Sequence, residues 1–446
     1  MPNLSSESRS AVPNSGQQER NPLVRPLVLY LLIVVAFAAI EWGYAGINAH
    51  VLHSVYPRTS PLFDPLDRYS DWTNFLPRAA HTGEPGMQTR IDLGLPYPYP
   101  LPSIYLFVLF LRLFADPTRA YIVFTVAAFA LATIFFSAYL RNIKASGLTQ
   151  AVVWITLLLG SPAAFLLDRG NIEVFLWLFV LSGLVCFVRD WKYLAAIFFA
   201  IAACMKIYPA LYFLLFIPRR QFKALALGVV ATAVFSLLAL AAVGPTIPAA
   251  LRDMSGSAKY LRDAQITAVA EGDLRFDHSL LGEYKQLDFT ILAARHLASP
   301  GHEPHFNRSV SAYSILAPLL FVFIYLGRLR RMPLLNQFAV LTILSVLLPY
   351  VSYEYTLVHI YLVLGVFLVF LNQDVRSGRT KVEPRRAKQI LVSFAILTAP
   401  ISFLALEHFQ GQIKCLALCS LMALFLFNEM PSSVFADSSR AASLTD

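Results

Sequence analysis

Long apolar runs separated by short polar turns dominate the chain. They lie near residues 26–45, 118–140, 148–166, 170–188, 193–217, 222–243, 309–327, 334–351, 354–372, 389–406 and 412–428. Runs of about 20 apolar residues are long enough to cross a bilayer as helices. The pattern predicts an all-α polytopic membrane protein with about twelve transmembrane helices, forming a single domain over residues 25–430.

Polar residues gather at the two ends of the chain and in two long internal segments. We expect residues 1–24 and 431–446 to be cytoplasmic tails, the first of them disordered. The segments 46–117 and 244–308 are predicted to be long outer loops. The first apolar run lacks a convincing cleavage site and is interpreted as an uncleaved helix.

Two ambiguous runs decide the topology. The run 101–114 is short and follows a proline cluster, whereas 193–217 is long but contains Lys206 and Pro209. Either 101–114 spans and 193–217 is one helix, or 101–114 is re-entrant or interfacial and 193–217 is a hairpin. Both schemes give twelve spans with both termini inside.

The positive-inside rule favours the second scheme, because short cytoplasmic loops carry an excess of lysine and arginine. In that scheme the loops containing Arg141 and Arg189 face the cytoplasm. They join the other basic positions Arg219, Arg220, Lys223, Arg328, Arg330, Arg331 and the stretch 376–388. The polar turn 168–173 and Lys206 then lie on the outer side with both long loops.

Composition narrows the class of protein further. Of the 446 residues, 57% are hydrophobic and only 14% are charged, against about 25% charged in soluble domains. This excludes an ordinary cytosolic enzyme, a disordered protein and a fibrous one. The net charge of +9 is explained by the basic loops without a nucleic-acid partner. All four cysteines lie in apolar runs, so we predict neither a disulfide nor a metal site.

The first outer loop carries candidate chemistry. Asp71 stands among aromatic residues and can accept a proton, although it can also simply begin an amphipathic helix. Tyr97 and Tyr99 alternate with prolines in a stiff segment that leads to the short run containing Arg112.

Two further positions lie in or beside spans. The connection 168–173 holds Asp168, Arg169, Asn171 and Glu173, more polar side chains than a turn requires, although Asp168 or Asn171 can cap the next helix. Lys206 interrupts an apolar run, where a cation needs a partner. A phosphate is one such partner, and an acidic residue on a neighbouring helix is the alternative.

Later in the chain, Glu354 lies at a span boundary, and Tyr355 and His359 share a helical face. A histidine near a helix end is often structural. Arg275, Asp277 and His278 form a weaker cluster in the second long loop.

Taken in order, these motifs resemble the GT-C superfamily of membrane glycosyltransferases, most closely glycosyltransferase family 87. The resemblance covers roughly residues 25–375 and rests on Asp71, Gly170-Asn171, Lys206, His278-Ser279-Leu280 and the segment 349–354. It departs at Tyr355-Thr356, where relatives often carry paired histidines.

The resemblance implies a GT-C-like helical bundle with an outward cavity, which uses a polyprenyl-phosphate sugar without a cofactor or an obligate metal. Asp71 would be the catalytic residue. Lys206, Arg169 and Arg112 would bind the donor phosphate. The cavity would be lined by Tyr97, Tyr99, Asn171, Glu173, His278, Glu354 and His359.

The expected function is therefore an inverting hexosyltransferase of the bacterial plasma membrane. It would transfer a hexose, mannose first among them, to a lipid or glycan acceptor on the outer face. The alternative is a transporter or flippase of lipid-linked saccharides. Transporters favour charged residues within several spans and internal repeats, and neither pattern is visible in the sequence.

Overall fold

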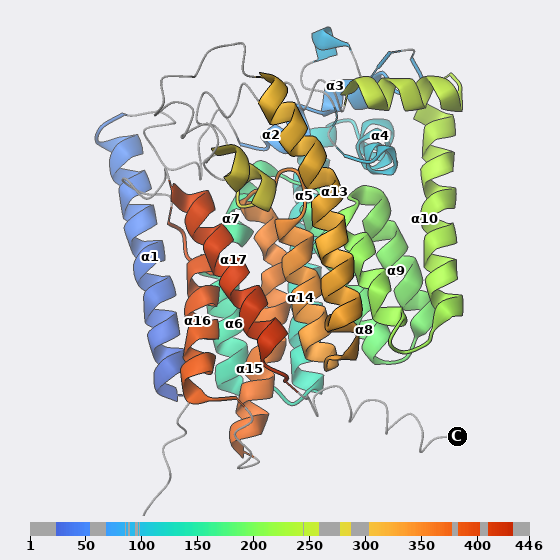
Figure 1. The fold of residues 1–446 in the computed structure, drawn as a ribbon. Helices are drawn as coiled ribbons and strands as arrows, with labels where there is room; N and C mark the ends of the chain where they lie inside the picture. Colours follow the sequence, from blue (N-terminus) through green and yellow to red (C-terminus); the bar gives the residue numbers. More distant parts are fainter. Residues whose placement is uncertain are drawn as a thin grey trace, which may run out of the picture.

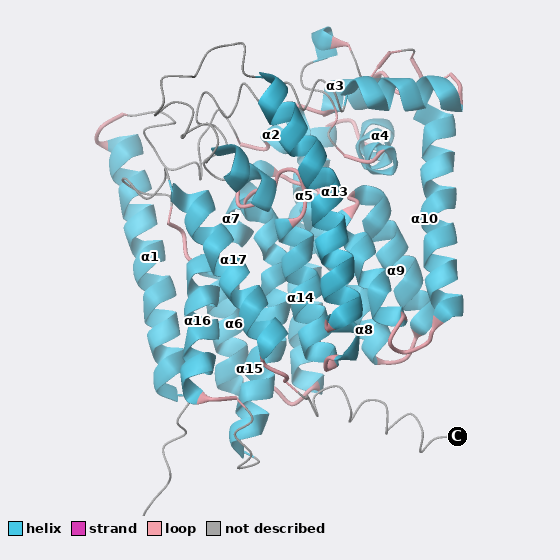
Figure 2. Ribbon diagram, viewed as in Figure 1, coloured by secondary structure: helices cyan, strands magenta, loops and turns pink. Residues whose placement is uncertain are grey.

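The protein is a bundle of helices packed side by side, seen in a computed structural model (Figure 1). The structure describes residues 24–53, 68–84, 86–87, 90–93, 97, 99–243, 245–257, 277–286, 303–376, 382–401 and 409–430. Within these ranges the chain forms helices and loops but no strand (Figure 2). The predicted tails, apart from Val24, and large parts of both long loops lie outside the described residues.

The first half of the bundle runs from α1 to α10. Its elements are α1 (Val24–His50), α2 (Ser70–Thr73), α3 (Leu76–Ala80), η1 (Ile91–Leu93), η2 (Leu101–Ser103), α4 (Ile104–Leu113), α5 (Pro117–Asn142), α6 (Gly147–Leu159), α7 (Ser161–Arg169), α8 (Glu173–Val188), α9 (Lys192–Met205), η3 (Tyr208–Phe216) and α10 (Phe222–Val243). The η elements are 3-10 helices.

The second half surrounds one central helix. Its elements are α13 (Glu303–Gly327), η6 (Leu329–Arg331), α14 (Leu334–Leu347), η7 (Glu354–His359), α15 (Ile360–Arg376), α16 (Pro384–Thr398) and α17 (Gln410–Phe427). The continuous segment of η7 and α15 is 94% buried, whereas α13 and α10 are only 11% and 22% buried. The segment of η7 and α15 is therefore the axis of the bundle, and α10 and α13 lie at the periphery of the bundle.

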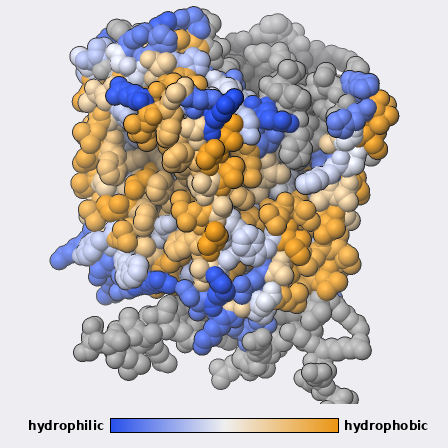
Figure 3. Space-filling model, turned by 180° about the vertical axis from the view of Figure 1, so that it is seen from behind, coloured by the Kyte–Doolittle hydropathy of each residue, from blue (hydrophilic) through white to orange (hydrophobic). Residues whose placement is uncertain are grey.

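Six described helices are long and apolar enough to cross a membrane, or seven if the bent pair α6 and α7 forms one span. A broad apolar band separates two polar ends on the face seen in Figure 3. An integral membrane protein is expected to have this surface. The prediction of about twelve spans is not confirmed, because several of the predicted spans correspond to helices of 10–17 residues.

The run 193–217 forms a hairpin, as predicted. Helix α9 ends at Met205, where Pro209 removes the amide hydrogen that would bond to the Met205 carbonyl. Gln221 Nε2 donates to Asp190 Oδ1 at 2.8 Å, so the chain returns to the end from which α9 started. This places Lys206 at the tip of the hairpin.

The short run 101–114 does not cross the bundle. Its helix α4 has ten residues and is seen nearly end-on beside the upright α10 in Figure 1. Phe107 packs on Tyr97 before α4 and lies 6.2 Å from Tyr121 at the start of α5, so the helix stays near one end of the bundle. This course agrees with the second topology scheme, in which 101–114 is not a span.

The basic turns lie at the opposite end from α2 and α4 (Figure 1). Arg219 donates to the Phe187 carbonyl at 3.1 Å, and Gln373 Nε2 donates to the Ile143 carbonyl at 3.1 Å. The first contact joins the turn after η3 to the end of α8, and the second joins the turn after α5 to the end of α15. By the positive-inside rule, this end is expected to face the cytoplasm.

The orientation is testable by cysteine labelling. In a background without Cys186, Cys204, Cys415 and Cys419, Asn142→Cys should react with a membrane-impermeant maleimide only after the cells are permeabilised. Asp92→Cys, exposed at the other end, should react in intact cells. If Asn142→Cys were labelled in intact cells, or if Asp92→Cys were protected there, the predicted orientation would be wrong.

Candidate active site

The side-chain amide of Asn171 forms hydrogen bonds with both Asp71 and Lys206. Its Nδ2 donates to Asp71 Oδ2 at 2.6 Å, and its Oδ1 accepts from Lys206 Nζ at 3.2 Å. A side-chain amide offers both a donor and an acceptor, so it can bond to a carboxylate and an ammonium at once. The same Oδ1 accepts from the Glu173 backbone N–H at 2.9 Å, which is the first N–H of α8. Asn171 thus bonds the start of α8 and takes part in the polar network at the same time.

Lys206 has a resident counter-ion. Its Nζ lies 2.6 Å from Glu173 Oε2, with both side chains buried. The ammonium also lies 4.7 Å from the ring centroids of both Tyr99 and Tyr355. A buried cation requires such partners, because desolvation costs several kcal/mol. The acidic residue on a neighbouring helix, left open from the sequence, is therefore present.

The other oxygen of Glu173 extends the network to the axis of the bundle. Oε1 lies 2.6 Å from His359 Nε2, and the Tyr208 hydroxyl donates to it. Both Glu173 and His359 are buried. Four elements thus meet at one carboxylate and its ammonium, namely α8, the α9–η3 hairpin, η7 and the turn before α8.

Asp71 is held in place by its neighbour. Trp72 is fully buried and stacks on Tyr121 and Phe107 at 3.9 and 4.7 Å between ring centroids. Its indole N–H donates to Thr118 Oγ1 at 3.1 Å. These contacts fix the single turn of α2 while the adjacent Asp71 stays partly exposed. A partly exposed carboxylate on a fixed backbone can meet a substrate hydroxyl.

Desolvation keeps the nearby phenol neutral. The pKa of Tyr99 is raised well above its usual value, first by desolvation and then by the negative charge of Asp71. The phenol oxygen accepts a hydrogen bond from Asn171 Nδ2 at 3.0 Å. Tyr99 therefore stays protonated and polar beside Asp71.

The turn before α8 depends on a glycine. Gly170 has a φ of +60°, and a Cβ there would lie 3.1 Å from the Tyr69 ring. The Tyr69 backbone N–H donates to the Asp168 carbonyl at 2.8 Å, and the Tyr121 hydroxyl donates to the Gly170 carbonyl at 2.9 Å. The turn is thus clamped against the segment that carries Asp71.

Arg169 brings a second cation close to Asp71. Its guanidinium lies 4.9 Å from the centroid of the Phe165 ring and donates to Ser70 Oγ at 3.2 Å. It is half-buried, unlike the deeply buried Lys206. Two of the three predicted phosphate-binding residues, Lys206 and Arg169, therefore lie at the same end of the bundle.

Two predicted residues are not brought into this network. Arg112 is exposed in the last turn of α4, which lies crosswise at the edge of the bundle. Tyr97 is buried, and its hydroxyl lies 2.6 Å from Oγ of Ser103, the last residue of η2. It packs on Phe75 and Phe107, which suits a structural role.

Two others lie in separate buried clusters. His278 is 3.2 Å from Ser352 Oγ and 3.3 Å from Thr356 Oγ1, and its neighbour Asp277 accepts from the Ser352 N–H. Glu354 pairs with Lys414. Both clusters contact η7, through Thr356 and through Glu354 itself.

Sequence reasoning missed two contributors. Tyr208 follows Lys206 in a Lys-Ile-Tyr-Pro motif, and this proximity was the available signal. From the sequence, Tyr355 shares a helical face with His359 and stands where relatives often carry a histidine. Its contact with Lys206 required knowledge of how η7 docks on the hairpin.

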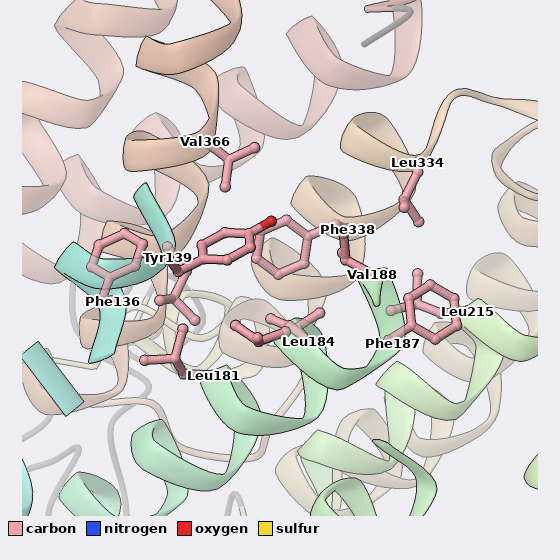
Figure 4. A pocket seen from close by; sticks show the side chains of 12 residues that line it. Phe136, Tyr139, Leu181, Leu184, Phe187, Val188, Leu215, Leu334, Phe338 and Val366 are labelled. Atoms are coloured by element: carbon pink, nitrogen blue, oxygen red, sulfur yellow. The ribbon is translucent and has the colours of Figure 1, made fainter. Parts of the chain in front are cut away.

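The described residues hold no group of three or more His, Cys, Asp or Glu side chains arranged to bind a metal ion. A small cavity of about 30 Å³ lies elsewhere, among apolar side chains of α5, α8, η3, α14 and α15 (Figure 4). It is lined by residues such as Phe136, Leu181 and Phe338. Its lining offers no chemistry for catalysis.

The fold is that of an integral membrane protein with a polar site near one end. A family model, glycosyltransferase family 87, matches residues 97–349, more than half of the chain. The chain therefore belongs to glycosyltransferase family 87. The matched segment includes Asn171, Glu173 and Lys206 but neither Asp71 nor His359. No curated protein matches the chain.

The Gly170 turn generates a stability prediction. Gly170→Ala should lower the free energy of unfolding by about 1–2 kcal/mol, because a left-handed backbone and a close contact both oppose a Cβ. Gly147→Ala is the matched control, since that helical position has open space around it. Thermal unfolding in detergent measures both. An unchanged Gly170→Ala midpoint would show that the turn tolerates a side chain.

Proposed function

We propose that the protein transfers a hexose, with mannose the first candidate, from a polyprenyl-phosphate donor to a lipid or glycan hydroxyl. The site would face the outer side of a bacterial plasma membrane. One observation carries the proposal: a partly exposed Asp71 is joined through Asn171 to a buried Lys206 at the end opposite the basic turns. Family membership favours an enzyme over a transporter.

In this proposal Asp71 is the general base. The acceptor hydroxyl oxygen attacks the anomeric carbon as the carbon–oxygen bond to the phosphate breaks, and Asp71 takes the hydroxyl proton. The electron pair leaves with the polyprenyl phosphate, and the configuration at the anomeric carbon inverts. The Asn171 amide, donating to Asp71 at 2.6 Å, supports this role by orienting the carboxylate.

Cations at the same end would stabilise the leaving phosphate. An ammonium has three N–H donors, and Glu173 and Asn171 accept two of those of Lys206. The third can donate to a phosphate oxygen. Arg169, half-buried and closer to the surface, offers a planar group suited to phosphate. Together they supply positive charge where negative charge develops.

The base assignment is tested by Asp71→Asn. The amide keeps the shape of the side chain but cannot take the proton, so transfer should fall by roughly 10²–10⁴-fold. Transfer from a radiolabelled polyprenyl-phosphate hexose in proteoliposomes measures it, and Asp92→Asn serves as the control in the same loop. Near-normal transfer by Asp71→Asn would assign the base to another residue.

The phosphate contact is tested without leaving a charge unpaired. Lys206→Met alone deprives Glu173 of its ammonium, although His359 and Tyr208 still contact the carboxylate, and should destabilise the protein by about 3–5 kcal/mol. The double variant Glu173→Gln/Lys206→Met removes both charges, so it should fold better and bind the donor more weakly by about 2–5 kcal/mol. Glu173→Gln alone keeps the cation and is the control. A folded double variant with unchanged donor affinity would contradict the assignment.

A further inference from the structure

A second buried charge pair lies in the described part of the bundle, away from Lys206. Glu354, the first residue of η7, pairs with Lys414 of α17. Lys414 Nζ also lies 3.2 Å from Ser161 Oγ, and Gln410 Nε2 donates to Glu354 Oε2 at 3.0 Å. Ser161 Oγ donates to Glu354 Oε1, the same oxygen that Lys414 contacts. All four side chains are buried.

These contacts join the elements that carry the site. Glu354 begins η7, in which Tyr355 contacts Lys206 and His359 contacts Glu173. Ser161 begins α7, which ends at Arg169 and the turn before α8. One carboxylate thus ties the start of both elements to α17, whose residues lie outside the segment matched by the family model.

Stability alone does not account for such a pair. A buried ion pair can often be replaced by apolar side chains of similar volume without loss of stability, since desolvation offsets the attraction. Three donors on one carboxylate instead hold the side chains around Glu354 in a single arrangement. Catalysis is sensitive to that arrangement, because a displacement of about 1 Å can cost 10²-fold in rate.

We infer that the Glu354–Lys414 pair positions η7 for sugar transfer. Lys414 touches no substrate in this scheme and acts through Glu354, Tyr355 and His359. The inference rests on the proposed function for its effect on rate. It adds that α17, although distant from Asp71 in sequence, is needed for turnover and not only for folding.

The test replaces both charges at once. Glu354→Gln/Lys414→Met keeps the volumes and removes both members of the ion pair. Gln410→Met removes one donor to Glu354 while leaving the ion pair in place, so it serves if the double variant does not fold. Tyr30→Phe is the matched control: it deletes another buried hydrogen bond, from Tyr30 to Thr398 at 3.2 Å, between α1 and α16.

Steady-state transfer from a polyprenyl-phosphate hexose is the first readout. The folded double variant should lose at least about tenfold in kcat while its KM for the donor stays within about twofold. Gln410→Met should lose several-fold, and Tyr30→Phe should match the wild type. A folded double variant or a folded Gln410→Met with wild-type kcat would overturn the inference.

The second readout does not depend on activity. With 3-fluorotyrosine incorporated, the ¹⁹F resonance of Tyr355, assigned by its loss in Tyr355→Phe, reports the environment beside Lys206. The resonance should shift in the Glu354→Gln/Lys414→Met double variant and in Gln410→Met, and it should stay in place in Tyr30→Phe. If the wild type transfers no sugar, the proposed function fails, but this shift still decides the positioning. An unshifted resonance overturns it.

Discussion

The site depends on keeping one ammonium inside an apolar bundle. Lys206 lies at the tip of a hairpin between two short helices, where water cannot solvate it freely. Its charge is balanced by Glu173 and by the faces of two tyrosine rings. Because leaving any of these groups unpaired would be costly, the elements that carry them must meet in one arrangement.

That requirement explains how distant parts of the chain form a single site. The turn before α8 supplies Asn171 and Glu173, the axis of the bundle supplies His359, and the first long loop supplies Asp71. The carboxylate of Asp71 is partly exposed, whereas Lys206 and Glu173 are buried. In the proposed reaction, this gives the base access to an acceptor while the cations remain shielded from water.

The class of helical membrane protein could be predicted from the sequence. Its composition and the length of its apolar runs follow directly from the need to bury a helical backbone in lipid. The hairpin at 193–217 was predictable from Lys206, Pro209 and the distribution of basic turns. The number of spans was not, since helices such as α9 and α14 are too short to be counted from length alone.

Individual contacts were predictable only in part. Asp71, Asn171 and Lys206 were each conspicuous as polar residues in aromatic or apolar surroundings, and the structure brings them together. The pairing of Glu173 with Lys206 was left open, because sequence spacing does not reveal which neighbouring helix supplies a counter-ion. Glu354 and His278 were conspicuous for the same reason, yet they stabilise other contacts of η7.

The most direct test of the central claim is a structure determined with a bound polyprenyl-phosphate sugar or a non-hydrolysable analogue. The account predicts that a phosphate oxygen lies within hydrogen-bond distance of Lys206 Nζ, with Asp71 facing the anomeric carbon from the side opposite the phosphate. A phosphate bound away from both Lys206 and Arg169, with the Asp71–Asn171–Lys206 connection unchanged, would contradict it.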